Sequence, residues 1–197
     1  DYYASRGLGD VYKRQFLDCT EIMNRYQETL YDKEAWLSPI RKSELLLYTT
    51  IVHIGNQNYK AAKKYISNAI VDHNIKYLPL MRTIRLVRLI AYYETQEYEL
   101  IRHESRSITR SLSSPKEQTF KTERIILWFL NKRNLPILRK DREAFWEKLS
   151  PEIQELYNDK YENQLLRIFD FTAWMESKIR KEKLSEVLRI HTNAKEP

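Results

Sequence analysis

Six arginines at helical spacing are the residues of this chain whose type and pattern best suit a chemical task. They form two sets, spaced by three residues in the first and by four in the second: Arg82, Arg85 and Arg88, then Arg102, Arg106 and Arg110. Residues three or four apart share one strip of a helix. A guanidinium donates paired hydrogen bonds to carboxylates and phosphates. The pattern therefore predicts two neighbouring basic strips that bind an acidic protein segment or a nucleic acid.

Positive charge is concentrated around these strips. Residues 79–140 contain thirteen Lys and Arg against six Asp and Glu, a surplus as large as the formal net charge of +7 of the whole chain. Such a surplus attracts anionic partners. The alternative is a solvated face with local ion pairs, for example between Glu99 and Arg102, or between Glu104 and a neighbouring helix.

Single-stranded nucleic acid is the second kind of partner that this pattern allows. Helical repeats can bind a single strand base by base, with aromatic rings stacking on the bases. Tyr92, Tyr93 and Tyr98 lie between the two arginine sets. Tyrosine occurs all along the chain, however, and also packs repeats together with its hydroxyl at the rim. An acidic protein segment is therefore the first hypothesis, and nucleic acid is the alternative.

The residue types that usually carry catalysis or hold metals are scattered in this sequence. They comprise four histidines far apart from one another and one cysteine: His53, His73, His103, His191 and Cys19. The sequence has no HExxH pattern, no paired Cys and His spacing and no glycine-rich phosphate loop. The acidic group Glu152, Glu155 and Asp159 has helical spacing and is expected to be solvated. We expect no catalytic residue, no cofactor and no metal.

Helices are the elements predicted to position the arginines. Only three glycines occur, and apolar residues recur every three or four positions instead of alternating. The longest apolar runs, such as 45–48 and 125–130, are far shorter than the roughly 20 residues that a membrane-spanning helix needs. One cysteine excludes an intrachain disulfide and fits a reducing compartment. A soluble, cytoplasmic, all-α protein is expected.

Four prolines recur at nearly constant spacing. They are Pro39, Pro79, Pro115 and Pro151, separated by 40, 36 and 36 residues. This is the spacing of helical-hairpin repeats. Three of the four follow a serine, the pattern of a serine N-cap with proline at the first helical position. Ser114 is also followed by Glu117, which completes a capping box. Each proline is predicted to begin a helix.

Each unit between these prolines has room for two antiparallel helices. The predicted helices cover about 16–30, 39–55, 59–71, 79–93, a segment from 98 onward, 115–130, a return helix through 144–149, 151–157 and 161–181. A shift of 39 residues places Gln57 on Gln96 and Tyr59 on Tyr98. Gly55 is predicted to cap the first helix of its hairpin. The last long helix, around Trp174, is predicted to close the stack.

The run Gln57-Asn58-Tyr59-Lys60-Ala61-Ala62 resembles the turn and second helix of a degenerate tetratricopeptide repeat. The runs 106–110 and 169–178 resemble the closing segments of a group of long bacterial tetratricopeptide-like proteins. The resemblance covers about residues 43–181. It departs from the standard repeat of about 34 residues in having longer units. It also lacks the Trp, Leu-Gly and Tyr series of the first helix, where Thr49, Thr50 and His53 stand.

This resemblance implies a right-handed superhelix of three to four hairpins with a C-terminal capping helix, an interaction role and no catalytic residues. Residues 9–15 look like a translated sequencing-library adaptor, so residues 1–15 are predicted to be non-native and the native protein to extend upstream. Residues 16–181 are predicted to form the helical-repeat domain. Residues 182–197 are predicted to be a charged tail that frays.

The functional hypothesis is a non-catalytic protein–protein interaction scaffold. Its concave side is predicted to bind an acidic segment through five arginines, namely Arg82, Arg85, Arg102, Arg106 and Arg110. A binder of single-stranded nucleic acid is the alternative. A purely intramolecular role, as the C-terminal stalk of a larger protein, is a third possibility.

Overall fold

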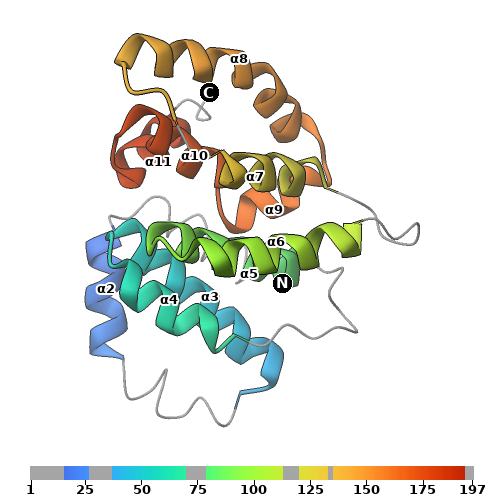
Figure 1. Cartoon of the computed structure of the whole chain (residues 1–197). Helices are drawn as coiled ribbons and strands as arrows, with labels where there is room; N and C mark the ends of the chain where they lie inside the picture. Colours follow the sequence, from blue (N-terminus) through green and yellow to red (C-terminus); the bar gives the residue numbers. More distant parts are fainter. Residues whose placement is uncertain (1–15, 27–36, 70–78, 113–119, 133–134, 194–197) are drawn as a thin grey trace. The chain divides into compact units, whose positions relative to one another are not determined.

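The structure is a computed structural model of the chain, and it describes residues 16–26, 37–69, 79–112, 120–132 and 135–193. Every regular element in these ranges is a helix, and no strand occurs among them (Figure 1). The prediction of an all-α protein is confirmed. The predicted non-native segment 1–15 lies outside the described residues.

The chain divides into two compact units, residues 1–108 (unit 1) and residues 109–197 (unit 2). The proline spacing instead predicts one repeat domain over residues 16–181. Periodic prolines do not show where contacts between neighbouring hairpins become sparse, because the spacing of helix starts is independent of how tightly successive hairpins pack.

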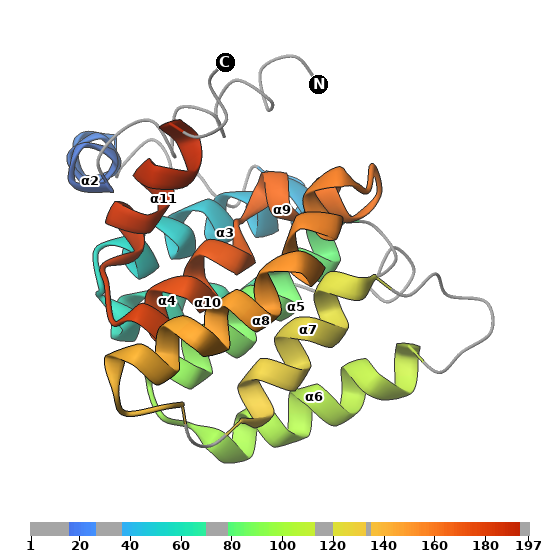
Figure 2. The same ribbon diagram turned by 90° about the horizontal axis from the view of Figure 1, so that it is seen from above.

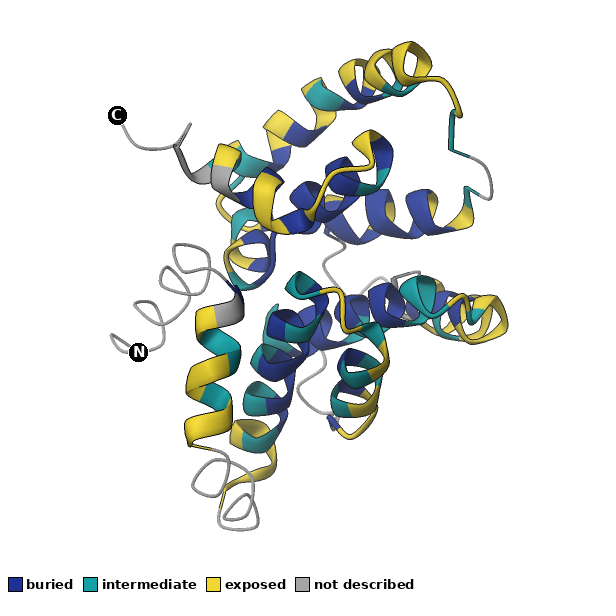
Figure 3. Cartoon of the chain, turned by 90° about the vertical axis from the view of Figure 1, so that its left-hand side faces the viewer, coloured by how far each residue is buried: buried dark blue, intermediate teal, exposed yellow. Residues whose placement is uncertain are grey.

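Unit 1 contains consecutive helices that pack on their neighbours. They are α2 (Phe16–Arg25), α3 (Pro39–Gly55), α4 (Tyr59–Ser67), α5 (Pro79–Glu94) and α6 (Tyr98–Leu112), the last continuing past residue 108. α3 packs against α2, α4 and α5, and α4 also packs against α5. Much of α3 and α5 is buried (Figure 3). The core includes Leu47, Ile51, Ala62, Ile66, Ile84, Leu86 and Ile90.

Two of the predicted helix starts are confirmed in unit 1. Pro39 occupies the first turn of α3, and the Ser38 hydroxyl accepts a hydrogen bond from the amide of Arg41 at 3.4 Å. α5 begins at Pro79. Both prolines stand where the helix leaves an amide without an internal partner, so the missing N–H has little cost.

The same turn joins α3 to α4 and α5 to α6. Gln57 and Gln96 have φ values of 60° and 61°, in the left-handed region. The amide after each glutamine bonds a carbonyl five residues back, from Asn58 to His53 and from Glu97 to Tyr92, both at 2.9 Å. This is the Schellman pattern of a helix C-terminus. The 39-residue correspondence in the sequence is therefore matched by the backbone.

Gly55 does not cap α3 through a left-handed conformation, which corrects the prediction for this residue. It is the last residue of α3, and the left-handed position belongs to Gln57. A Cβ added at Gly55 would lie 2.3 Å from the ring of Phe16, the buried first residue of α2. The Asn56 side-chain amide also donates to the carbonyl of Phe16 at 3.1 Å. The glycine is needed for the close approach of α2.

Unit 2 is assembled around α10. Its helices are α7 (Lys121–Asn131), α8 (Arg139–Asn158), α9 (Glu162–Ile168), α10 (Phe171–Arg180) and α11 (Leu184–Asn193). α10 packs against α7, α8 and α11, and Figure 2 shows α7, α8 and α10 running alongside one another. The Trp174 ring is fully buried and meets Phe129 edge to face at 5.5 Å. The predicted terminal helix around Trp174 is thus central to its unit.

A buried carboxylate caps α7. Glu162, the first residue of α9, accepts hydrogen bonds from the Thr122 amide at 3.0 Å and the Thr122 hydroxyl at 2.8 Å. It also accepts from the amide of Lys121. These donors are among the unsatisfied N–H groups of a helix N-terminus, where negative charge is favoured. The predicted start at Pro115, with Ser114 and Glu117, lies outside the described residues.

Pro151 does not begin a helix, and the prediction for this proline is wrong. It lies inside α8, where it removes one backbone hydrogen bond at a cost of about 3 kcal/mol. Apolar side chains on both sides of it are buried, namely Trp146, Leu149, Ile153 and Leu156. Burial of each stabilises the helix by about 1.5–3 kcal/mol. One continuous helix that buries all four outweighs the missing hydrogen bond.

The single predicted helix 161–181 is two helices, and this prediction is also wrong. α9 ends at Ile168, and the Asp170 carboxylate caps α10 by accepting from the amide of Ala173 at 2.9 Å. The break brings the rings of Phe169 and Phe171 together edge to face at 4.9 Å, both of them buried. Two aromatic rings enter the core because the chain changes direction between them.

The predicted fraying tail is wrong for residues 184–193, which form α11. Leu184, Val187 and Leu188 of this helix are buried. α10 ends at Arg180. Its C-cap residue Lys181 has φ 62°, and the amide of Glu182 bonds the carbonyl of Ser177 at 3.0 Å. This left-handed turn starts the segment that leads into α11. Among the described helices, none has both the length and the apolarity needed to cross a bilayer.

Candidate functional site

The first set of predicted arginines lies between helices. Arg82 is buried at 4% exposure, so it does not present its guanidinium to a partner. Arg85 donates to the Glu104 carboxylate of α6 at 3.3 Å and to the Ser107 hydroxyl at 3.3 Å. Arg85 therefore joins α5 to α6. The spacing of this set correctly predicts a shared helix, but the strip faces neighbouring helices.

Arg88 has a structural task at the end of α4. Its guanidinium donates to the carbonyl of Ala69 at 2.8 Å and to the carbonyl of Ile66 at 3.3 Å. Carbonyls at a helix C-terminus lack intrahelical partners and attract cations. The arginines of α5 thus hold hairpins together, which the spacing alone could not distinguish from ligand binding.

The second set lies on the exposed side of α6. Arg102 pairs with Glu99 at 3.1 Å, as the solvated-face alternative predicts. Arg106 and Arg110 are exposed, and neither forms an ion pair with another described residue. A spacing of four residues puts these two guanidiniums one turn apart. Of the predicted arginines, these two have guanidinium groups that can bind a ligand without first breaking an ion pair.

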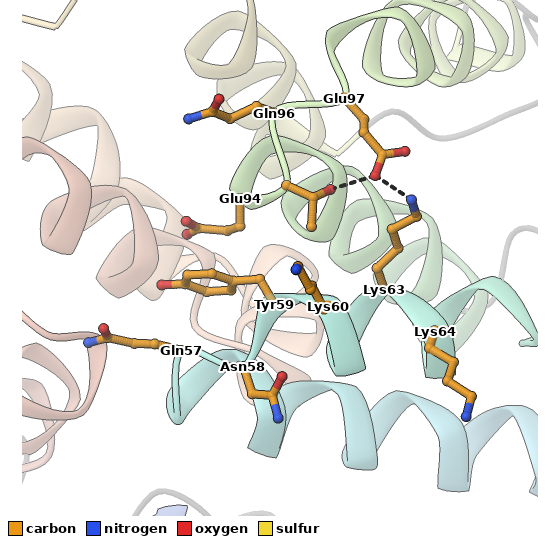
Figure 4. A pocket seen from close by; sticks show the side chains of 10 residues that line it. Gln57, Asn58, Tyr59, Lys60, Lys63, Lys64, Glu94, Gln96 and Glu97 are labelled. Carbon is orange, nitrogen blue, oxygen red and sulfur yellow. Dashed lines mark hydrogen bonds and ion pairs between the residues drawn. The ribbon is translucent and has the colours of Figure 1, made fainter.

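A groove of about 800 Å³ lies between the two repeated turns of unit 1 (Figure 4). One wall is the start of α4 and the other is the turn before α6. Its lining comprises Gln57, Asn58, Tyr59, Lys60, Lys63 and Lys64 on the first wall, and Glu94, Thr95, Gln96 and Glu97 on the second. The volume falls in the usual range of ligand pockets, roughly 300–1,000 Å³. The sequence analysis did not predict this groove, although it recognised the correspondence between its two walls.

One ion pair crosses the groove. The Lys63 ammonium contacts the Glu97 carboxylate, and the Thr95 hydroxyl donates to the same carboxylate at 3.0 Å (Figure 4). The hydrogen bond from Lys63 is the main reason that the pKa of Glu97 is lowered. Both charges are therefore largely satisfied within the groove.

Two further lysines remain at the same wall. Lys60 and Lys64 are exposed, lie one turn apart on α4 and form no ion pair with another described residue. The groove consequently has cationic side chains that can still take up an anionic group. Lys60 and Lys64 of α4 thus resemble Arg106 and Arg110 of α6. All four are exposed cations that form no ion pair with another described residue.

Unit 2 holds a buried polar cluster that the sequence analysis missed. The Tyr157 hydroxyl lies 2.9 Å from each carboxylate oxygen of Asp170 and also contacts Thr172. His191 joins the cluster through two carboxylates, with its Nδ1 3.4 Å from Asp170 and its Nε2 2.7 Å from Glu176. His191 was predicted to be isolated, and this is wrong because helix α11 folds back onto α10.

The electrostatics of this cluster favour a positively charged imidazole beside a negative carboxylate. Burial by itself lowers the pKa of His191, but the hydrogen bonds to Asp170 and Glu176 outweigh it and raise the pKa to about 9. Burial by itself raises the pKa of Asp170, yet hydrogen bonds led by the one from His191 hold it below its usual range. Burial, with the Asp170 charge next, raises the pKa of Tyr157.

The contacts of His191 do not favour a general-base role for it. A general base needs a free nitrogen lone pair near neutral pH, whereas both ring nitrogens of His191 face carboxylates and the ring holds its proton. The contacts join α8, α10 and α11, which is a structural task. Within the described ranges, no group of three or more His, Cys, Asp and Glu residues could hold a metal ion.

The remaining predicted positions are placed as follows. Glu152 and Glu155 are exposed, and Glu155 pairs with Lys121 at 3.3 Å. Asp159 accepts from the amide of Tyr161 at 2.8 Å, a local turn contact. Cys19 is partly exposed and forms no disulfide. His73 lies outside the described residues.

Comparisons of the chain with protein-family models, with curated proteins and with solved structures give no match.

Proposed function

We propose that the chain is a non-catalytic interaction module of tetratricopeptide-like hairpins, and that α6 binds an acidic segment of a partner protein. The observation that carries this proposal is the pair Arg106 and Arg110, exposed one turn apart with no ion pair to another described residue. Two guanidiniums one turn apart on one helix can each bind a carboxylate through paired hydrogen bonds. Two of the five predicted arginines are not part of this proposal. Arg82 is buried, and Arg85 is paired with Glu104.

The repeated turn supports the hairpin part of the proposal. α3 with α4, and α5 with α6, form two hairpins related by 39 residues and closed by the same Schellman turn. α4 packs against both α3 and α5, so it lies between neighbours as a stacked repeat requires. We propose that these hairpins are repeats of a right-handed superhelix. A cytoplasmic location is part of the same proposal.

We propose that the same acidic segment continues from α6 to the groove. Glu97 of the groove immediately precedes α6, and the distance along the helix from there to Arg110 is about 20 Å. An extended acidic segment of about six residues covers that length. Its carboxylates then meet Arg110 and Arg106 along α6, and Lys60 or Lys64 at the groove. Arg102 contributes less, because binding there competes with Glu99.

Titration with a fluorescently labelled oligoglutamate peptide tests this proposal. The double variant Arg106→Glu with Arg110→Glu should bind at least about tenfold more weakly, because two charge-assisted hydrogen-bonding groups become repulsive. The matched control is Lys160→Glu with Arg167→Glu, which makes the same charge change at two exposed positions of unit 2. Equal weakening in both variants would mean that only net charge matters and would overturn the site.

Single-stranded nucleic acid is the second candidate, and exposure of Tyr98 favours it. This tyrosine begins α6 and is 57% exposed, so its ring is available for stacking on a base. For an oligouridine probe, the affinity should fall steeply with salt, with a slope that reports the phosphates engaged. Tyr98→Ala should weaken oligouridine binding by about tenfold. Tyr161→Ala, at a tyrosine 56% exposed in unit 2, is the matched control.

A further inference from the structure

The segment that leads into α8 exposes two adjacent aliphatic side chains. Ile137 is 83% exposed and Leu138 is 67% exposed, more than any other large apolar side chain among the described residues. In Figure 3 this segment and the start of α8 are coloured as exposed. Single exposed apolar residues are ordinary, but two at the tip of a hairpin mark a contact surface. The surface lies in unit 2 and is independent of α6.

Basic residues flank these aliphatic side chains. Lys132 precedes the segment, and Arg139 and Lys140 follow Leu138 directly. Lys140 is exposed and forms no ion pair with another described residue, while Arg139 shares its charge with Glu143 in an exposed pair at 2.8 Å. From residue 132 to residue 140 the sequence contains no acidic residue. The aliphatic tip therefore lies between cations.

Part of the backbone at this tip does not depend on water. The carbonyl of Ile137 accepts a hydrogen bond from the Arg142 guanidinium, and Pro136 has no N–H to satisfy. An unsatisfied backbone group is costly to move from water into an apolar medium. These two groups can leave water at little cost, whereas the first amides of α8 have no side-chain cap and stay at the level of the headgroups.

An aromatic pair lies on the same hairpin. The rings of Trp128 and Phe145 are parallel within 6° with centroids 6.0 Å apart, and the Lys132 ammonium lies 4.6 Å from the Trp128 ring. Trp128 is 43% exposed. An indole ring favours the boundary between water and lipid, and a lysine stem can lie along apolar surface while its charge stays in water.

We propose that this tip, formed by Ile137, Leu138, Arg139 and Lys140, docks on an anionic lipid bilayer surface. The two aliphatic side chains enter between the headgroups, and the flanking cations pair with the lipid phosphates and carboxylates. Charge complementarity selects this partner. A bilayer also requires no matching pocket, which suits two side chains that project from a hairpin tip. The contact is peripheral and reversible, since few apolar groups take part.

Sedimentation of the full chain with vesicles tests the proposal. The chain should bind phosphatidylcholine vesicles that contain phosphatidylserine, and bind vesicles of phosphatidylcholine alone at least about tenfold more weakly. Ile137→Ser with Leu138→Ser should weaken binding to the anionic vesicles by about tenfold or more. Ile190→Ser, at an exposed isoleucine of α11, should leave it unchanged.

The charge contribution has its own matched pair on α8. Lys140→Glu should weaken binding several-fold, whereas Lys148→Glu on the same helix should have a smaller effect. Trp128 fluorescence should shift to shorter wavelength with anionic vesicles, and Trp128→Phe should remove that shift.

Two results would overturn this assignment. The first is equal sedimentation of the wild-type chain and the double serine variant. The second is self-association that depends on Ile137 and Leu138 without vesicle binding, which would make the tip a contact between copies of this chain. If the charge reversal of Arg106 and Arg110 abolishes vesicle binding while the serine variant retains it, the lipid contact belongs to α6 and the tip proposal fails.

Discussion

The two units of this chain are held together in different ways. Unit 1 repeats one local device, since the turn at Gln57 recurs at Gln96 with the same hydrogen bonds. Unit 2 relies on contacts that occur once, such as Glu162 capping α7 and Asp170 joining Tyr157 to His191. The first kind of stabilisation is local and spread over hairpins. The second concentrates buried polar groups in a few positions, where a single substitution costs most.

The largest expected effect comes from Asp170. Asp170→Ala removes the cap of α10 and leaves the Tyr157 hydroxyl and the His191 charge without their shared carboxylate. We expect a loss of about 2–4 kcal/mol in the free energy of unfolding of unit 2, because a helix cap and a buried hydrogen-bond acceptor are removed together, while His191 keeps Glu176 at 2.7 Å. Urea unfolding followed by circular dichroism measures it. Asp141→Ala, at an exposed position of α8, is the control. Equal losses in the two variants would show that the cluster does not hold unit 2 together.

His191 should make the stability of unit 2 depend on pH. The pKa of its imidazole is raised to about 9 in the folded chain from an ordinary value of 6.5. Because the folded-state pKa is the higher one, the stabilisation is complete below pH 6.5 and is lost as pH rises from 6.5 to about 9. We expect a loss of about 2 kcal/mol over this window, which is less than the full linkage value because solvent screens the partly exposed ring.

Urea unfolding at both ends of this pH window measures the effect. His191→Gln should be less stable than the wild-type chain at the lower pH and should lose the pH dependence. The exposed His103 is the control, and His103→Gln should keep it. The Asp170 carboxylate does not interfere, because its lowered pKa places its contribution above pH 3.8 and its loss in more acidic solution. An unchanged pH profile in His191→Gln would contradict the proposed charge state.

Gly55 tests the local side of the comparison. Gly55→Ala places a methyl group against the ring of Phe16 and should destabilise unit 1 by about 1–3 kcal/mol through overpacking. In a Phe16→Ala background the ring is gone. The same substitution should then stabilise the chain by up to about 1 kcal/mol, because alanine favours the helix over glycine. The double-mutant cycle measures this change of sign, and a Gly55→Ala effect that is the same in both backgrounds would show that Phe16 is not the cause.

The same contrast explains which features the sequence could predict. Helix starts at Pro39 and Pro79, and the 39-residue correspondence, depend on neighbouring residues only and were predicted. Pro151 was misassigned because its local signal favours a helix start, while buried side chains on both sides of it decide the outcome. The break at Asp170 has a local cause in its capping carboxylate, and an aspartate directly before a run of apolar residues is a helix-start signal that could have been used.

The candidate site was predicted less well than the fold, for a related reason. Spacing places Arg82 and Arg106 on helices equally well, but it cannot show that one helix is covered by its neighbours and the other is not. His191 and Asp170 are 21 residues apart, and no local pattern connects them. Such contacts depend on how helices pack. Exposure and pairing, which separate a structural arginine from an available one, are tertiary properties.

The smallest expected effect tests whether the two turns of unit 1 are true equivalents. Gln57 and Gln96 both have left-handed backbones, which cost a residue with a Cβ about 1 kcal/mol relative to glycine. Gln57→Gly and Gln96→Gly should therefore each stabilise unit 1 by about 0.5–1 kcal/mol, and the two gains should add because the turns are separate. Gln154→Gly in α8 is the control. There the backbone is helical, so the same substitution should destabilise by about 1 kcal/mol. If only one of the two substitutions stabilises unit 1, the two turns have the same backbone conformation but contribute differently to stability.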